Sequence, residues 1–140
     1  MKSNVEKYFE KLINEYDEGD INLVPSNISD EELKHVPKAL HELYKVISEA
    51  ELPFGEIFSI DNALKKSESE PFKSDWFVFG HDNYFSFWLC SLKPNSKGLS
   101  FTSWDHECPE IGGAVNKDII SFLEDMEDDA GDDGYIPPFC

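Results

Sequence analysis

The sequence predicts one α+β domain, in which an antiparallel meander sheet is flanked by N-terminal helices and a C-terminal helix. Apolar residues recur at helical spacing near both ends of the chain, whereas residues 76–104 hold short runs rich in aromatic and β-branched residues. Helices thus come first, then strands, then a helix, which is the order typical of an α+β domain. Because 140 residues suffice for one core, we expect a single domain over residues 1–140, with an acidic tail over about residues 124–140.

The first helix is expected to begin near Val5 and to end at Gly19. Its apolar side chains follow one another at steps of three and one, which places them on one face of a helix. The opposite face is charged, so this helix should pack against the rest of the domain. The apolar face consists of Val5, Tyr8, Phe9, Leu12, Ile13 and Tyr16.

A second helical segment starts with a capping box, in which Glu32 follows Ser29 at the required spacing. The apolar stripe then continues past Pro37, whose ring would break a helix interior but fits the first helical position. We therefore expect a short turn up to Val36 and a main helix from Pro37 to about Glu49.

The first strand of the sheet is expected over residues 56–60, after a break that contains Pro53 and Gly55. Asp61 can cap one or two helical turns that follow this strand. The polar stretch over residues 65–71 is expected to be an exposed loop.

The centre of the predicted sheet is a β-hairpin formed by residues 76–79 and 84–90. The cluster over residues 80–83, Gly-His-Asp-Asn, lies between the two strands and tolerates a tight reversal. Residues 99–104 alternate in the same way and supply a third consecutive strand.

Alternation within residues 84–90 separates two faces of the sheet. The apolar face should turn toward the core and carries Phe85, Phe87 and Leu89. The mixed face carries Tyr84, Ser86, Trp88 and Cys90. Two alternatives stay open at this point: helices cover the mixed face and bury its aromatic residues, or the face is exposed and binds a partner.

A last helix is expected to be capped near Asn116 or Asp118, after a loop over residues 105–114. The segment that follows, over residues 124–133, is nearly all acidic. The buried side of this helix should consist of Ile119, Ile120, Phe122, Leu123 and Met126.

The charge of the chain restricts its partners. Twelve basic and twenty-nine acidic residues give a formal net charge of −17, which repels phosphate backbones and anionic lipids and attracts a basic protein. A well-solvated surface is the simpler explanation of so much acid. The N-terminal residues lack an apolar signal segment, and the three cysteines lack CxxC spacing, so we expect reduced thiols and a cytoplasmic location.

Catalytic and metal-binding motifs fail when they are examined one by one. The segment HELYK at residues 41–45 lacks the second histidine of HExxH. Asp105, His106 and Cys108 concentrate groups that can bind metal, but no paired cluster supplies further ligands. The acidic stretch counted from Asp125 departs from an EF-hand loop, which needs glycine at the sixth position and glutamate at the twelfth. We expect no enzyme activity, no cofactor and no metal.

Several segments, read in order, resemble the SMI1/KNR4 superfamily, also called SUKH. They are VPKALHELYKVI (36–47), FGEIFSIDNAL (54–64), WFVFGHDN (76–83) and WDHE (104–107) before a helix with Phe122 and Leu123. The chain departs from the family where Ser48, Glu49 and Ala50 replace a common extended turn. The resemblance implies an α+β fold without catalysis, and many bacterial members are immunity proteins that bind and neutralise toxins, often nucleases.

We therefore expect a non-catalytic immunity protein that binds a basic toxin domain, since a nuclease must attract phosphate and tends to be basic. Acidic residues would steer the partner, and aromatic residues on the mixed face would anchor it. The expected partner-binding residues are Glu124, Asp125, Glu127, Asp128, Asp129, Asp132, Asp133, Tyr84, Trp88 and Trp104. Two alternatives are a general SMI1/KNR4-type interaction scaffold and a metal- or ligand-binding protein that uses Asp105, His106 and Cys108.

Overall fold

The structure is a computed structural model that describes residues 3–83, 86–93, 97–105, 107–108 and 110–130. Its helices are α1 (Asn4–Glu15), α2 (Asp30–Leu33), α3 (His41–Tyr44), α4 (Ile60–Ser67) and α5 (Ile119–Ala130), with single 3₁₀ turns η1 (Glu18–Asp20) and η2 (Lys38–Leu40). Its strands are β1 (Asn22–Pro25), β2 (Ile47–Leu52), β3 (Gly55–Ile57), β4 (Trp76–Asp82), β5 (Ser86–Ser91) and β6 (Phe101–Asp105).

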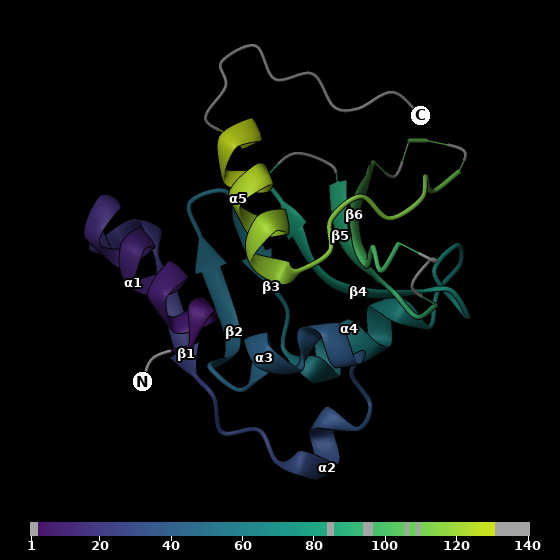
Figure 1. The fold of residues 1–140 in the computed structure, drawn as a ribbon, viewed down its shortest axis with the longest axis horizontal. Coiled ribbons are helices and arrows are strands. Elements are labelled where there is room, and N and C mark those ends of the chain that lie inside the picture. Colours follow the sequence, from purple (N-terminus) through teal and green to yellow (C-terminus); the bar gives the residue numbers. More distant parts are fainter. Residues whose placement is uncertain (1–2, 84–85, 94–96, 106, 109, 131–140) are drawn as a thin grey trace.

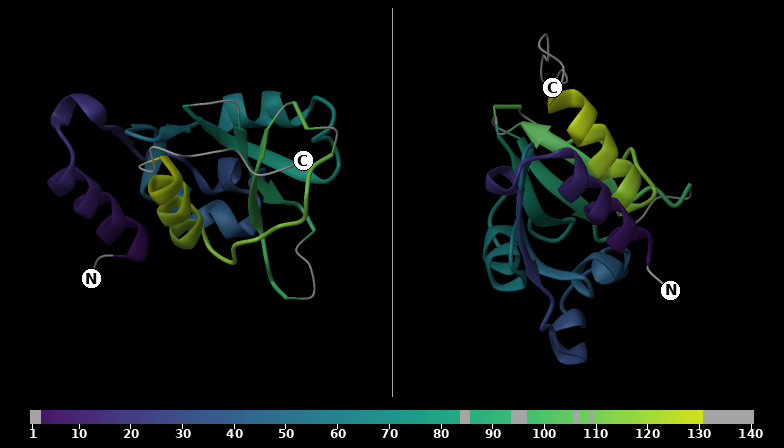
Figure 2. Two further views of the ribbon diagram at one scale, coloured as in Figure 1. Left: turned by 90° about the horizontal axis from the view of Figure 1, so that it is seen from above. Right: turned by 90° about the vertical axis from the view of Figure 1, so that its left-hand side faces the viewer.

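The six strands form one antiparallel sheet whose spatial order is the order of the chain, from β1 to β6 (Figure 1). The predicted α+β meander, with N-terminal helices and a C-terminal helix, is confirmed. Strands β1 and β6 are its two edges. Figure 2 shows α1 and α5 on one side of the sheet and α4 on the other, so both faces of its centre are covered.

Helix α1 begins at a capping box, because the Ser3 hydroxyl accepts from the Glu6 backbone N–H while the Glu6 carboxylate accepts from Ser3. The predicted apolar stripe is buried at Val5, Tyr8, Phe9 and Leu12. The helix ends at Glu15, four residues before the predicted glycine, and Ile13 is 54% exposed.

The capping box of Ser29 and Glu32 is present and starts α2, as predicted. The predicted main helix from Pro37 to Glu49 is wrong, because α3 ends at Tyr44 and β2 follows almost at once. Buried and exposed residues alternate from Glu49 to Leu52 of β2, as expected for a strand with one face on the core. Pairing with β1 and β3 decides this conformation against the helical pattern of the isolated segment.

The predicted hairpin is confirmed as β4 and β5, but its strands are longer than expected. The predicted turn over residues 80–83 is wrong for its first three residues, because Gly80, His81 and Asp82 belong to β4 and pair with β3. The Asp82 carboxylate accepts from the Ser86 backbone N–H at 3.0 Å. The predicted face residues Tyr84 and Phe85 lie outside the described residues.

Of the two alternatives left open for the mixed face of β5, the structure supports the one in which helices cover this face and bury Trp88. Trp88 is fully buried, and its ring packs against those of Phe79 and Phe122 on the α5 side. Phe87, on the opposite face, is half-buried against Phe72, which follows α4. Each face of the strand therefore meets a layer of its own, and the Trp88 layer is the more deeply buried.

The C-terminal helix begins as predicted, because the Asp118 side chain accepts from the Ser121 backbone N–H at 2.8 Å. Its side chains Ile119, Phe122 and Leu123 are buried against the sheet.

The expectation of reduced thiols holds for Cys90, which is free and buried, and is wrong for Cys108, which is disulfide-bonded. Within the described residues, no helix combines the length and the apolar character needed to cross a membrane.

Candidate functional site

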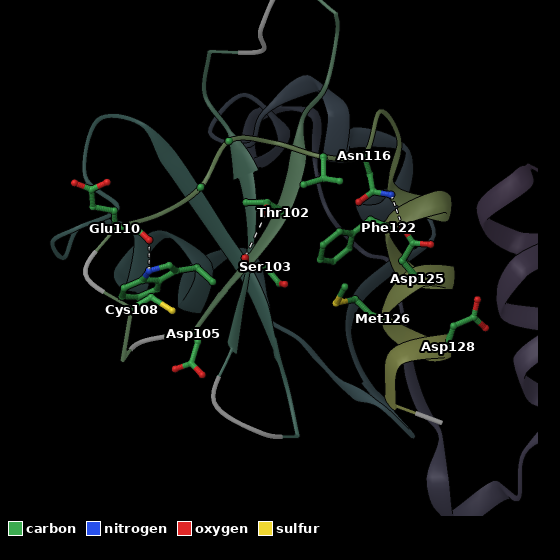
Figure 3. A pocket seen from close by; sticks show the side chains of 14 residues that line it. Thr102, Ser103, Asp105, Cys108, Glu110, Asn116, Phe122, Asp125, Met126 and Asp128 are labelled. Atoms are coloured by element: carbon green, nitrogen blue, oxygen red, sulfur yellow. Dashed lines mark hydrogen bonds between the residues drawn. The ribbon is translucent and has the colours of Figure 1, made fainter. Parts of the chain in front are cut away.

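A groove of about 510 Å³ runs beside the last strand of the sheet (Figure 3). Strand β6 forms its floor, α5 forms one wall, and the segment between β6 and α5 forms the other. The described lining residues are Thr102, Ser103, Trp104, Asp105, Cys108, Glu110, Gly112, Gly113, Val115, Asn116, Phe122, Asp125, Met126 and Asp128.

Apolar surface lines both walls of the groove. The Val115 side chain is 64% exposed, and Met126 of α5 is half-buried beside the fully buried Phe122. Figure 3 shows Phe122 and Met126 projecting from α5 toward β6. An alkyl chain laid in the groove would thus find apolar contacts without unfolding any part of the domain.

All the charged residues that line the described part of the groove are acidic. Asp125 and Asp128 lie on α5, Asp105 lies at the end of β6, and Glu110 lies on the opposite wall (Figure 3). Asn116 donates to the Asp125 carboxylate at 2.7 Å and holds it at the rim. Figure 3 shows the Glu110 carboxylate directed away from α5, so a cation in the groove would meet the carboxylates of the α5 wall most directly.

The predicted acidic residues do not all lie at the surface. Glu124, Asp125 and Asp128 are exposed on α5, and Asp129 lies near the end of the same helix. Glu127 is half-buried, because it accepts hydrogen bonds from the hydroxyls of Tyr8 at 3.2 Å and Tyr16 at 2.9 Å. Glu127 therefore links α5 to the α1 segment and stabilises the fold. The remaining two predicted acidic residues, Asp132 and Asp133, lie outside the described residues.

The tyrosines that contact Glu127 show the electrostatic consequence of this arrangement. Burial raises the pKa of the Tyr16 phenol to about 12, and the hydrogen bond to Glu127 and its charge add to the effect. Burial, followed by the Glu127 charge, raises the pKa of the Tyr8 phenol further. Both phenols therefore stay protonated and remain donors at any physiological pH.

Two of the predicted aromatic anchors, Trp88 and Trp104, are not available on the surface. Trp88 is 0% exposed, which excludes it as a contact residue in this structure. Trp104 is 9% exposed, packs edge-on against Phe72, and donates its indole N–H to the Glu110 backbone carbonyl at 3.1 Å. It positions one wall of the groove. Tyr84 lies outside the described residues.

The alternative metal site is not assembled by the described residues. Asp105 and Cys108 both line the groove, but no group of three or more histidine, cysteine, aspartate or glutamate side chains in the described part of the chain could hold a metal ion. The third residue of this hypothesis, His106, lies outside the described residues.

Sequence reasoning identified the acidic wall of the groove but missed the groove itself. The acidic composition of residues 124–133 predicts the carboxylates of the α5 wall. The opposite wall depends on Glu110 and Val115, which lie in a segment whose sequence has no helical or strand periodicity.

The chain was compared with models of protein families, with curated proteins and with solved structures. None of the three comparisons found a match.

Proposed function

We propose that the protein is a non-catalytic binding protein whose partner is a basic protein domain. The observation that supports this proposal most strongly is the groove beside β6, where both walls carry carboxylates and the described lining includes no basic side chain. A net charge of −17 extends the same attraction over a longer range, which accelerates the encounter with a positively charged partner.

The specific role that we propose is immunity: the protein binds and neutralises a cognate toxin. The resemblance of four segments to the SMI1/KNR4 superfamily supports this role, and the charge supports a nuclease as the toxin, because a nuclease active site attracts phosphate. Neutralisation needs only a stable complex that blocks the toxin, so no catalytic group is required of this chain.

A general interaction scaffold is the alternative within the same family resemblance. The gene neighbourhood separates the two: a toxin-domain reading frame beside this one favours immunity, and a gene without such a neighbour favours the scaffold. In either case the protein is expected to act by binding through its acidic surface.

Co-expression with the neighbouring toxin domain tests the immunity role. We expect the wild-type protein to restore growth and to elute with the toxin in gel filtration. Absence of rescue together with absence of a complex would overturn the immunity role.

A pair of matched variants tests which acidic surface carries the binding. The double variant Asp125→Lys with Asp128→Lys should lose rescue. Glu49→Lys with Glu51→Lys changes the net charge by the same amount at exposed positions of β2, and it should retain most of the rescue. Equal loss in both variants would show that total charge, and not the groove, determines binding.

A further inference from the structure

We propose that the groove binds an extended, lysine- or arginine-bearing segment of the partner, which adds a short strand to the free edge of β6 at Ser103. This inference rests on the proposed function, because it specifies how a basic protein partner docks. Three observations support it: the backbone hydrogen bonds at the edge of β6, the shape of the groove and the charge of the groove walls.

The backbone groups of β6 point alternately toward β5 and away from it. The backbone groups of Phe101 point away from β5. The Phe101 N–H donates to the Asn116 carbonyl at 3.0 Å, and the Phe101 carbonyl accepts from the N–H groups of Val115 and Asn116. By alternation, Ser103 and Asp105 also direct their backbone groups to the outer edge. The segment that follows β6 therefore covers the edge at Phe101.

Ser103 is the open position of this edge. Its backbone N–H has no partner in the part of the chain that the structure describes, and its carbonyl accepts only a long 3.4 Å hydrogen bond from the Thr102 hydroxyl. The Asp105 carbonyl, one step further along the outer edge, accepts from the Cys108 N–H at 2.9 Å. One donor and one acceptor thus stay available between two occupied positions, which suits a short extended segment.

The side chains of the groove specify the chemistry of this segment. In an added strand, alternate side chains point to one face, where Met126 and Val115 offer apolar contact. The alkyl stem of a lysine or arginine can lie on this surface while its charged end reaches Asp125 or Asp128. A second copy of this chain is disfavoured as the occupant, because it too carries a net charge of −17.

A designed peptide tests the inference without knowledge of the natural partner. The probe is a synthetic hexapeptide of alternating lysine and valine with blocked ends, and the control replaces each lysine by glutamate. We expect the lysine peptide to bind the full-length protein and the glutamate peptide to bind at least about tenfold more weakly. Chemical shifts in NMR spectra should change most at Ser103, Val115 and Met126.

Amide hydrogen exchange reports directly on the added strand. In the wild-type protein saturated with the lysine peptide, exchange of the Ser103 amide should slow about tenfold or more, because that N–H gains an acceptor. An unchanged Ser103 exchange rate with the peptide bound would overturn the inference, since the peptide would then lie on the acidic surface without pairing with β6.

A pair of variants at Ser103 provides an independent test. Ser103→Pro removes the outward N–H without removing a hydrogen bond to β5, a position at which an edge strand tolerates proline. Ser103→Ala keeps the N–H and serves as the matched control. We expect the proline variant to bind the peptide about tenfold more weakly than the alanine variant, and equal affinities would contradict the proposal. If both variants bound the toxin domain like the wild type, strand addition would be refuted while the proposed function would stand.

Discussion

The Trp88 ring leaves no room for a side chain at two glycines of neighbouring strands. A Cβ atom at Gly80 would lie 2.7 Å from Trp88 Cε3, and one at Gly55 would lie 2.6 Å from Trp88 Cη2. The added atoms would also collide with backbone carbonyls of Glu56 and His81, which cannot move without disturbing the sheet. These glycines are required by close approach to Trp88, and neither has a positive φ angle.

The substitution Gly80→Ala should therefore lower the free energy of unfolding by about 2 kcal/mol or more, because the core at this point is already filled. Gly19→Ala is the matched control, since no atom lies within 4 Å of a Cβ placed there. It should change stability by less than about 0.5 kcal/mol. Urea denaturation of the two variants checks this prediction, and equal stabilities would refute the packing described for Trp88.

The contacts of Tyr8 and Tyr16 with Glu127 affect how the stability of the folded protein responds to alkaline pH. The pKa of Tyr16 is raised to about 12 in the folded state, and that of Tyr8 is raised as well, whereas an unfolded tyrosine keeps a pKa near 10.0. This stabilisation is complete below the unfolded pKa and is lost as the pH rises toward the folded pKa, because the unfolded chain releases the protons first.

The variant Glu127→Gln removes the charge that contributes to both shifts but leaves the burial, which is their largest cause. We therefore expect its stability to fall less than that of the wild type between about pH 8 and about pH 11. Denaturant unfolding at the two pH values measures the difference. Burial also raises the pKa of Cys90 to about 12, but this effect is common to both proteins and cancels in the comparison.

The start of α5 sets the position of the acidic wall. Asp118 caps this helix through the Ser121 N–H. Asp118→Ala should destabilise the protein by about 1 kcal/mol, because an orphan donor at the helix start loses its acceptor. Lys117→Ala, at the preceding exposed position, should have a much smaller effect. Thermal unfolding of the two variants checks the prediction, and equal midpoints would count against the cap.

The sequence predicted those elements whose signals are local. Capping at Ser29 and Asp118, and the apolar stripe from Val5 to Leu12, depend on residues within one or two turns of each other, and the structure contains all three. Strand β2 was missed because its alternation is short and merges with the helical stripe of residues 37–44. Only its pairing with β1 and β3, at long range, makes it a strand.

The faces of β5 show a second limit of the same kind. Alternation in the sequence separates Phe87 from Trp88, but it does not tell which layer lies against which face. The packing of Phe122 from α5 on Trp88 makes that face the deeper one. Likewise, the acidic composition of residues 124–133 predicts the acidic residues of α5, whereas the groove depends on the return of Val115 and Asn116 to the edge of β6.

For the whole molecule, the net charge of −17 should have opposite effects on folding and on binding. Salt screens the repulsion among the acidic residues, so added sodium chloride should raise the unfolding midpoint of the free protein. The same screening should weaken a complex with a basic partner. Thermal unfolding across a salt series measures the first effect, and a midpoint that falls steadily with salt would contradict it.

We propose that this protein binds a basic protein domain through the acidic groove beside β6. Isothermal titration calorimetry with a purified candidate toxin domain provides the test. We predict a one-to-one complex whose affinity falls at least about tenfold when salt rises from about 50 mM to about 500 mM, and falls again in the Asp125→Lys, Asp128→Lys variant. No binding at low salt, or an affinity that neither salt nor these substitutions change, would contradict the claim.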